Sequence, residues 1–155
     1  MNTLVNMSAM QKTMCLVKSI YSKLDYLAPL SNLAIRLWVA NVFFKSGLTK
    51  IGTWDSTLYL FENEYSVPLL SPEIAATLAA GIELGFPILL ALGLMGRFSA
   101  FVLFVFNIIA VISYPDLNPA GVVQHQMWGI MLLVPFLQGP GKLSVDCFLK
   151  RTLKL

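Results

Sequence analysis

The sequence is poor in charged residues, in cysteine and in histidine. Asp, Glu, Lys and Arg together make up 12% of the 155 residues, and there are two cysteines and one histidine. An ordinary soluble domain carries about 25% charged residues, so this chain lacks the polar surface that such a domain needs. Two cysteines cannot build a disulfide scaffold, and one histidine cannot build a zinc or paired-haem site. We therefore expect no dedicated metal site.

Apolar residues are abundant instead. They make up 57% of the chain, and the mean hydropathy is +0.72, which excludes intrinsic disorder. Four apolar stretches each approach the ~20 residues with which a helix crosses a bilayer core. These stretches are Leu30–Ile51, Ile74–Gly96, Phe98–Pro115 and Ala120–Gln138. The sequence therefore predicts an all-α fold, an integral membrane four-helix bundle.

Lysine and arginine are unevenly distributed between the two sides of these stretches. One side holds the basic residues of the N-terminal segment, of the second connection and of the tail: Lys12, Lys18, Lys23, Arg97, Lys142, Lys150, Arg151 and Lys154. The other side holds Lys50 and most of the acidic residues. Basic residues favour the cytoplasmic side, so we expect both termini in the cytoplasm. The pI near 9.0 then reflects topology and contact with anionic lipid, and nucleic acid is not an expected partner.

Two segments flank the predicted transmembrane domain, which covers residues 29–150. In residues 1–28, apolar side chains recur at steps of three and four: Met7, Met10, Met14, Val17, Tyr21 and Leu24. This spacing is typical of an amphipathic helix at the membrane interface, and a mobile tail is the alternative. Residues 151–155 are expected to form a basic cytoplasmic tail. The apolar loop over residues 52–71 should cover the outer end of the bundle or lie on the membrane surface.

Polar side chains inside the predicted spans form the candidate site. Such residues are costly in hydrocarbon and usually face the interior of a bundle. At ~1.5 Å of rise per helical residue, most of them lie between the outer boundary and the midplane. This common depth predicts a polar pocket that opens outward. Its residues are Arg36, Asn41, Lys45, Glu83, Asn107 and His125.

Arg36 is the expected partner of Glu83 in the core of the bundle. Its guanidinium can hold a carboxylate through two parallel hydrogen bonds. Arg36 and Lys50 share one face of the first span, whereas Asn41 and Lys45 share another. The expected pair either fixes the register of the helices or takes part in binding a ligand or a proton.

The conspicuous residues follow one another in a recognisable order. They are Arg36, then Phe43-x-x-x-Gly47-x-x-Lys50, then Glu83, then Gly93-x-x-x-Arg97, and then the run from Gly139 to Asp146. This order resembles the DoxX family of small four-helix membrane proteins of bacteria and archaea, over residues 30–150. The resemblance implies a multi-pass protein of the bacterial inner membrane. Some relatives are subunits of a thiosulfate:quinone oxidoreductase, and others associate with proteins that handle thiols.

Two functions are compatible with these features. The first is an accessory subunit of a membrane redox system, in which the polar pocket holds a quinone. No other cofactor is evident from the sequence. Arg36 or Lys45 would then donate to a quinone oxygen, and Glu83 and His125 would transfer protons. The alternative is a non-enzymatic membrane anchor or assembly partner. The expected partners are the lipid bilayer, a redox protein that carries the electrons and a second copy of the chain.

The charge distribution gives a testable topology. Single cysteines introduced next to Glu62 and Asp116 should react with a membrane-impermeant thiol reagent added to intact cells, because both positions belong to the acidic side. The native Cys147 should react only after the cells are opened. Labelling of Cys147 in intact cells would contradict the predicted orientation.

Overall fold

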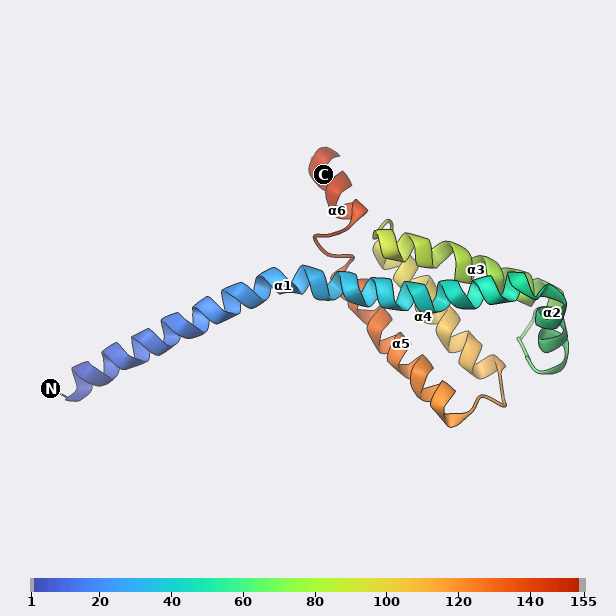
Figure 1. Ribbon diagram of the computed structural model, residues 1–155, viewed down its shortest axis with the longest axis horizontal. Coiled ribbons are helices and arrows are strands. Elements are labelled where there is room, and N and C mark those ends of the chain that lie inside the picture. Colours follow the sequence, from blue (N-terminus) through green and yellow to red (C-terminus); the bar gives the residue numbers. More distant parts are fainter. Residues whose placement is uncertain (1, 154–155) are drawn as a thin grey trace.

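The computed structural model describes residues 2–153, with side chains for residues 10–153 (Figure 1). All six elements in this range are helices: α1 (Asn2–Gly52), α2 (Trp54–Asn63), α3 (Pro72–Leu92), α4 (Gly96–Ser113), α5 (Pro119–Gln138) and α6 (Val145–Leu153). The predicted all-α fold is confirmed. The side chain of Met7 and the last two residues of the expected tail, 154–155, lie outside the described residues.

Four of these helices are long and apolar enough to cross a membrane. They are Met10–Gly52 within α1, and the whole of α3, α4 and α5. Local sequence determines where α3 ends and where α5 begins. Asn118 accepts a hydrogen bond from the backbone N–H of Gly121 (2.8 Å) and so caps α5. The chain leaves α3 through Gly93, whose φ of 67° suits glycine. The four predicted spans are thus present, and the protein is a multi-pass membrane protein.

The four long helices form a closed ring in which α1 contacts α3 and α5, and α4 contacts α3 and α5. Their shared core is apolar and consists of Val39, Ala40, Phe43, Leu90, Ala100, Leu103 and Leu132. The short helix α2 packs against α3 and the end of α1. A second apolar cluster lies there, built from Phe61 and the small residues Ala75, Ala76 and Ala79. The apolar segment 52–71 therefore covers one end of the bundle, and part of it is helical.

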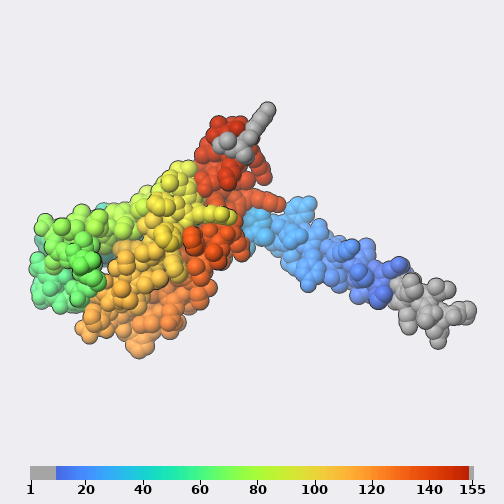
Figure 2. All heavy atoms as spheres, turned by 180° about the vertical axis from the view of Figure 1, so that it is seen from behind, coloured from blue at the N-terminus to red at the C-terminus, as the bar shows by residue number. Residues whose placement is uncertain are grey.

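Helix α1 is far longer than a membrane span. Its 51 residues extend over ~76 Å, whereas the bilayer core is ~30 Å thick. Helix α1 passes through Pro29 without ending, and its axis changes direction in the light-blue part around residue 30 (Figure 1). From residue 10 to this bend, α1 stands clear of the bundle (Figure 2). The boundary expected between residues 28 and 29 is therefore a bend inside one helix.

Helix α6 likewise crosses the expected boundary between residues 150 and 151. It lies at the end of the bundle opposite to α2 (Figure 1). Asp146, in its first turn, accepts hydrogen bonds from the backbone N–H groups of Met95 and Gly96, both at 2.9 Å. This carboxylate joins α6 to the turn between α3 and α4. The two ends of the bundle thus differ, because α2 packs over one end, whereas α6 is attached to the other end through Asp146.

Candidate functional site

The partner of Glu83 is Lys50. The ammonium nitrogen of Lys50 lies 2.6 Å from Glu83 Oε2 and also donates to the hydroxyl of Ser46 (3.0 Å). Ser46 in turn donates to Glu83 Oε1 (3.2 Å). The side chains of Lys50 and Glu83 are only 18% and 6% exposed, so the charges lie inside the protein. A buried pair of this kind is tolerated when both charges are also hydrogen-bonded, as they are here.

Glycine at position 47 allows α1 and α3 to approach closely enough for this pair. A Cβ atom built on Gly47 would lie 3.0 Å from the Cβ of Glu83 and 3.0 Å from side-chain atoms of Leu84. One turn earlier on the same face, Phe43 is 3% exposed and packs edge-on against Phe106 of α4 and Trp128 of α5. The spacing Phe43, Gly47, Lys50 therefore describes one packed face of α1.

The expected pair of Arg36 and Glu83 is wrong. Arg36 precedes Lys50 by 14 residues, which is ~21 Å along a helix, and this places it near the other end of the bundle. Its guanidinium donates to the backbone carbonyl oxygens of Leu90 and Ala91 at the end of α3 (3.0 and 2.9 Å), and of Leu143 before α6. Its Nε donates to Asn32 one turn earlier (3.2 Å). Arg36 is thus a structural clamp.

Glycine at position 93 belongs to the same clamp. A Cβ on Gly93 would lie 2.6 Å from Arg36 Nη1 and 2.5 Å from the Cβ of Ser144, so no larger residue fits. The carbonyl oxygen of Gly93 accepts a hydrogen bond from the backbone N–H of Asp146 (3.1 Å). Asn32 adds a bond to the carbonyl oxygen of Gly139 (3.2 Å). The motif residues Arg36 and Gly93 therefore hold the connections together.

Asn107 and His125 contact each other between α4 and α5. The amide Nδ2 of Asn107 donates to the backbone oxygen of His125 (2.9 Å), and its Oδ1 lies 2.8 Å from His125 Nδ1. Because the first bond fixes which way the amide points, the oxygen faces the ring, and Nδ1 must carry the proton. The other ring nitrogen, Nε2, is then a proton acceptor whenever the histidine is neutral.

Asn41 and Lys45 lie outside this arrangement. Both side chains are exposed. At 100° per residue they lie on a different face of α1 from Phe43 and Gly47, which face the bundle. Depth along the helix placed them beside Glu83 in the sequence analysis, but the direction of the side chain separates them from it. The expectation that they line the pocket is wrong.

A cavity of about 390 Å³ adjoins the buried ion pair at the end of the bundle that α2 covers. Its walls are mostly apolar and come from α1, α2, α3, α4, α5 and the loops that follow α2 and α4. Polar groups reach it from Ser46, Lys50, Glu83, Ser113, Tyr65, Tyr114 and His125. Of these, the Ser113 hydroxyl is 1% exposed at the residue level and has no hydrogen-bond partner within residues 10–153.

Two tyrosines form the cover of this cavity. Phe61, Tyr65 and Tyr114 stack in sequence, with ring centroids 4.6 and 4.9 Å apart. The hydroxyl of Tyr114 donates to Glu64 (2.9 Å), and this hydrogen bond raises the pKa of Tyr114. Burial likewise raises the pKa of Tyr65. Both phenols therefore keep their protons at neutral pH and remain hydrogen-bond donors.

Of the polar residues that line the cavity, Glu83 and His125 were predicted from sequence, whereas Lys50, Ser46 and Ser113 were missed. The predicted Asn107 does not line the cavity but contacts His125. Lys50 was assigned to the membrane boundary because the first predicted span, Leu30–Ile51, ends one residue later. Helix α2 folds back over this end, and Thr57 donates to the carbonyl oxygen of Lys50 (3.0 Å). The apolar composition of residues 52–71 was the signal that Lys50 would be covered.

Comparison with known proteins identifies the family of this chain. The family model named DoxX matches residues 31–115, more than half of the chain. An uncharacterized protein of Haemophilus influenzae is 32% identical over 130 residues, which cover 78% of this chain and 84% of that protein. No solved structure shows significant similarity. The chain belongs to the DoxX family.

The two partners proposed for Glu83 can be separated by double-mutant cycles. Lys50→Met and Glu83→Leu should each destabilise the protein by ~3–5 kcal/mol, because each leaves one buried charge without a partner. The double variant should regain much of this loss. Thermal unfolding in one detergent gives the four stabilities of the cycle. A second cycle with Arg36→Met is the control, and its effects should add to those of Glu83→Leu without recovery. Recovery in the Arg36 cycle alone would contradict the assignment.

Proposed function

We propose that the protein is an accessory subunit of a redox system in the bacterial inner membrane, and that the cavity beside Lys50 and Glu83 receives the head group of a quinone. The observation that carries the proposal is the hydroxyl of Ser113, which has no hydrogen-bond partner among the described residues and lies in the wall of a mostly apolar cavity. A buried polar group without a partner is uncommon in a folded protein, and a ligand acceptor would satisfy it.

The chemistry of the lining suits a quinone ring. A quinone presents two carbonyl oxygens, which accept hydrogen bonds, on a flat apolar ring. The cavity offers donors at Ser113, Tyr65 and Lys50 between apolar walls such as Ile82 and Phe106. Small-molecule sites commonly combine apolar walls with a few polar anchors in this way. Lys50 thus takes the role that the sequence analysis gave to Arg36 or Lys45.

Access to the cavity supports a ligand that is soluble in lipid. Leu78 of α3 and Ile109 of α4 both line the cavity, and they are 49% and 39% exposed. The cavity therefore reaches the outer surface between α3 and α4, both of which are candidate membrane spans. A quinone dissolved in the bilayer would enter through this side.

Proton transfer is assigned to His125. Interconversion of a quinone and its quinol moves protons together with electrons, so a group that can accept a proton is needed near the ring. The bond to Asn107 leaves His125 Nε2 as that acceptor. Glu83 is held by Lys50 and Ser46, and we assign it the role of a fixed negative charge that keeps Lys50 in place.

Electrons would come from a partner protein. The described residues contain no group of three His, Cys, Asp or Glu side chains that could hold a metal ion. We propose that a separate protein bearing a flavin, a metal or a dithiol supplies the electrons. The present chain is then an accessory subunit that holds the quinone.

A membrane anchor is the second candidate function, and the N-terminal part of α1 favours it. This part extends beyond the bundle, and apolar side chains such as Ile20, Leu24 and Leu27 are at least half exposed. Such a helix could hold another protein at the membrane. The anchor function does not require the cavity to bind anything.

Quinone binding by the purified protein distinguishes the two functions. Titration with a short-chain quinone, followed by tryptophan fluorescence, should show saturable binding, because Trp128 contacts His125 (ring centroids 4.8 Å apart). Ser113→Ala should leave the unfolding temperature unchanged or higher but weaken binding about 3- to 10-fold, the effect of losing one hydrogen bond to the ligand. His125→Leu should lower the quinone-dependent activity measured with a redox partner.

Asn41→Leu is the matched control, because it removes a polar side chain from the same bundle at an exposed position outside the cavity. It should leave quinone affinity unchanged. Wild-type protein that binds no quinone, alone or with a redox partner, would refute the redox function and favour the anchor.

A further inference from the structure

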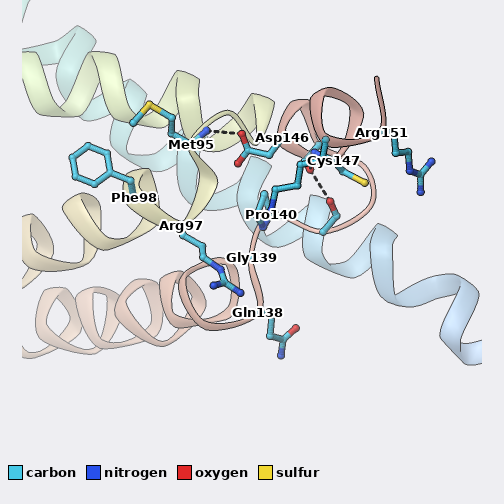
Figure 3. Close-up of a pocket in the computed structure, with 12 residues that line it drawn as sticks. Met95, Arg97, Phe98, Gln138, Gly139, Pro140, Asp146, Cys147 and Arg151 are labelled. Atoms are coloured by element: carbon cyan, nitrogen blue, oxygen red, sulfur yellow. Dashed lines mark hydrogen bonds between the residues drawn. The ribbon is translucent and has the colours of Figure 1, made fainter. Parts of the chain in front are cut away.

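A second hollow lies at the opposite end of the bundle from the quinone cavity. It is an open groove of about 950 Å³ between the start of α4, the end of α5 and helix α6 (Figure 3). We call it the basic groove, and define it by Arg97, Phe98, Gly139, Asp146, Lys150 and Arg151. Nothing in the proposed quinone function involves these residues.

The groove carries a positive net charge. Three of its lining residues are cations, Arg97, Lys150 and Arg151, and one is an anion, Asp146. The carboxylate of Asp146 is already engaged, because its two oxygens accept hydrogen bonds from the backbone N–H groups of Met95 and Gly96. Figure 3 shows the bond from Met95. Three cations and one anion therefore line the groove, and the anion is already hydrogen-bonded to the backbone.

Most of the N–H donors of Arg97 have no acceptor among the described residues. Its side chain lies along Gly139, where a Cβ would come within 3.4 Å of Nε (Figure 3). Its one hydrogen bond to a described protein atom is long, from Nη2 to the carbonyl oxygen of Leu137 at 3.4 Å. A guanidinium has five N–H donors in a planar fork that matches the oxygens of a phosphate. Arg97 can therefore bind a phosphate in the groove without giving up a strong internal bond.

The groove also lies where the membrane surface must be. It is formed at the ends of α4 and α5, both candidate membrane spans, so it adjoins the edge of the hydrocarbon core. Phe98, next to Arg97, is 51% exposed, and Phe101, one turn further along α4, is 45% exposed. The ring of Phe101 packs against that of Phe136, with the ring centroids 5.4 Å apart. An apolar surface therefore continues from the groove along the outside of α4 and α5.

We propose that the basic groove binds an anionic phospholipid, with its phosphate on Arg97, Lys150 and Arg151 and an acyl chain against Phe98 and Phe101. Cationic pockets between helices at the membrane surface bind such head groups. The conspicuous arginine of the Gly93-x-x-x-Arg97 motif then acts as a lipid ligand, whereas Gly93 is part of the Arg36 clamp. The lipid would join α6 to the bundle.

Native mass spectrometry of the full chain in detergent tests this proposal. Phosphatidylglycerol and phosphatidylcholine with identical acyl chains are titrated onto the protein. Phosphatidylglycerol should bind at least about 10-fold more tightly than phosphatidylcholine. Lys150→Gln/Arg151→Gln should weaken phosphatidylglycerol binding about 10- to 30-fold, because each basic residue near a membrane surface contributes about fivefold. Binding of phosphatidylcholine should not change. Both residues are exposed on α6, so the variant should keep its helix content.

The control is Lys18→Gln/Lys142→Gln, which removes the same charge outside the groove and should change the affinity less than about twofold. Arg97→Gln provides an independent variant on another helix and should weaken phosphatidylglycerol binding about fivefold. Equal binding of the two lipids would overturn the proposal. Equal loss in the control variant would overturn it as well, since binding would then follow net charge. Equal affinity for glycerol 3-phosphate and for the whole lipid would show a phosphate site and exclude the lipid.

Discussion

The contact between α1 and α3 is the constraint on which the rest of the structure depends. It is held at one end by the buried pair of Lys50 and Glu83 and at the other by the bonds from Arg36 to the last carbonyl oxygens of α3. Between them, Gly47 removes the side chain that would keep the two helices apart. Lipid offers no hydrophobic force to press helices together. Close packing and these polar contacts must therefore fix how the two helices lie.

The two ends of the bundle have different chemistry. At the end covered by α2, the buried charges adjoin a cavity with polar groups that are available to a ligand. At the other end, the guanidinium of Arg36 donates four hydrogen bonds to backbone and amide oxygens, and the cations Arg97, Lys150 and Arg151 line the groove beside α6. The first end suits an uncharged ligand that enters from lipid. The second suits an anionic ligand at the membrane surface.

The fold could be predicted from sequence because the long apolar runs of this chain have one stable form in a bilayer, the helix. The faces of the first span could be predicted as well, since Arg36, Phe43, Gly47 and Lys50 all point inward. The partner of Glu83 could not be predicted from sequence. The depth of a residue was counted from the predicted outer end of its span. Because α2 folds over Lys50, this residue is covered by protein and does not lie at the membrane boundary. Depth also says nothing of direction, and for this reason Asn41 and Lys45 were wrongly placed in the pocket.

The central claim is that the cavity beside Lys50 and Glu83 receives a quinone head group, and photoaffinity labelling tests it most directly. The purified protein is irradiated with an azido-quinone, and the labelled peptides are mapped by mass spectrometry. The account predicts labels on cavity-lining positions within residues 65–83 and 106–117, which excess unlabelled quinone suppresses. Labels confined to the exposed outer face of α1 around Asn41 and Lys45, or labels that unlabelled quinone does not suppress, would contradict it.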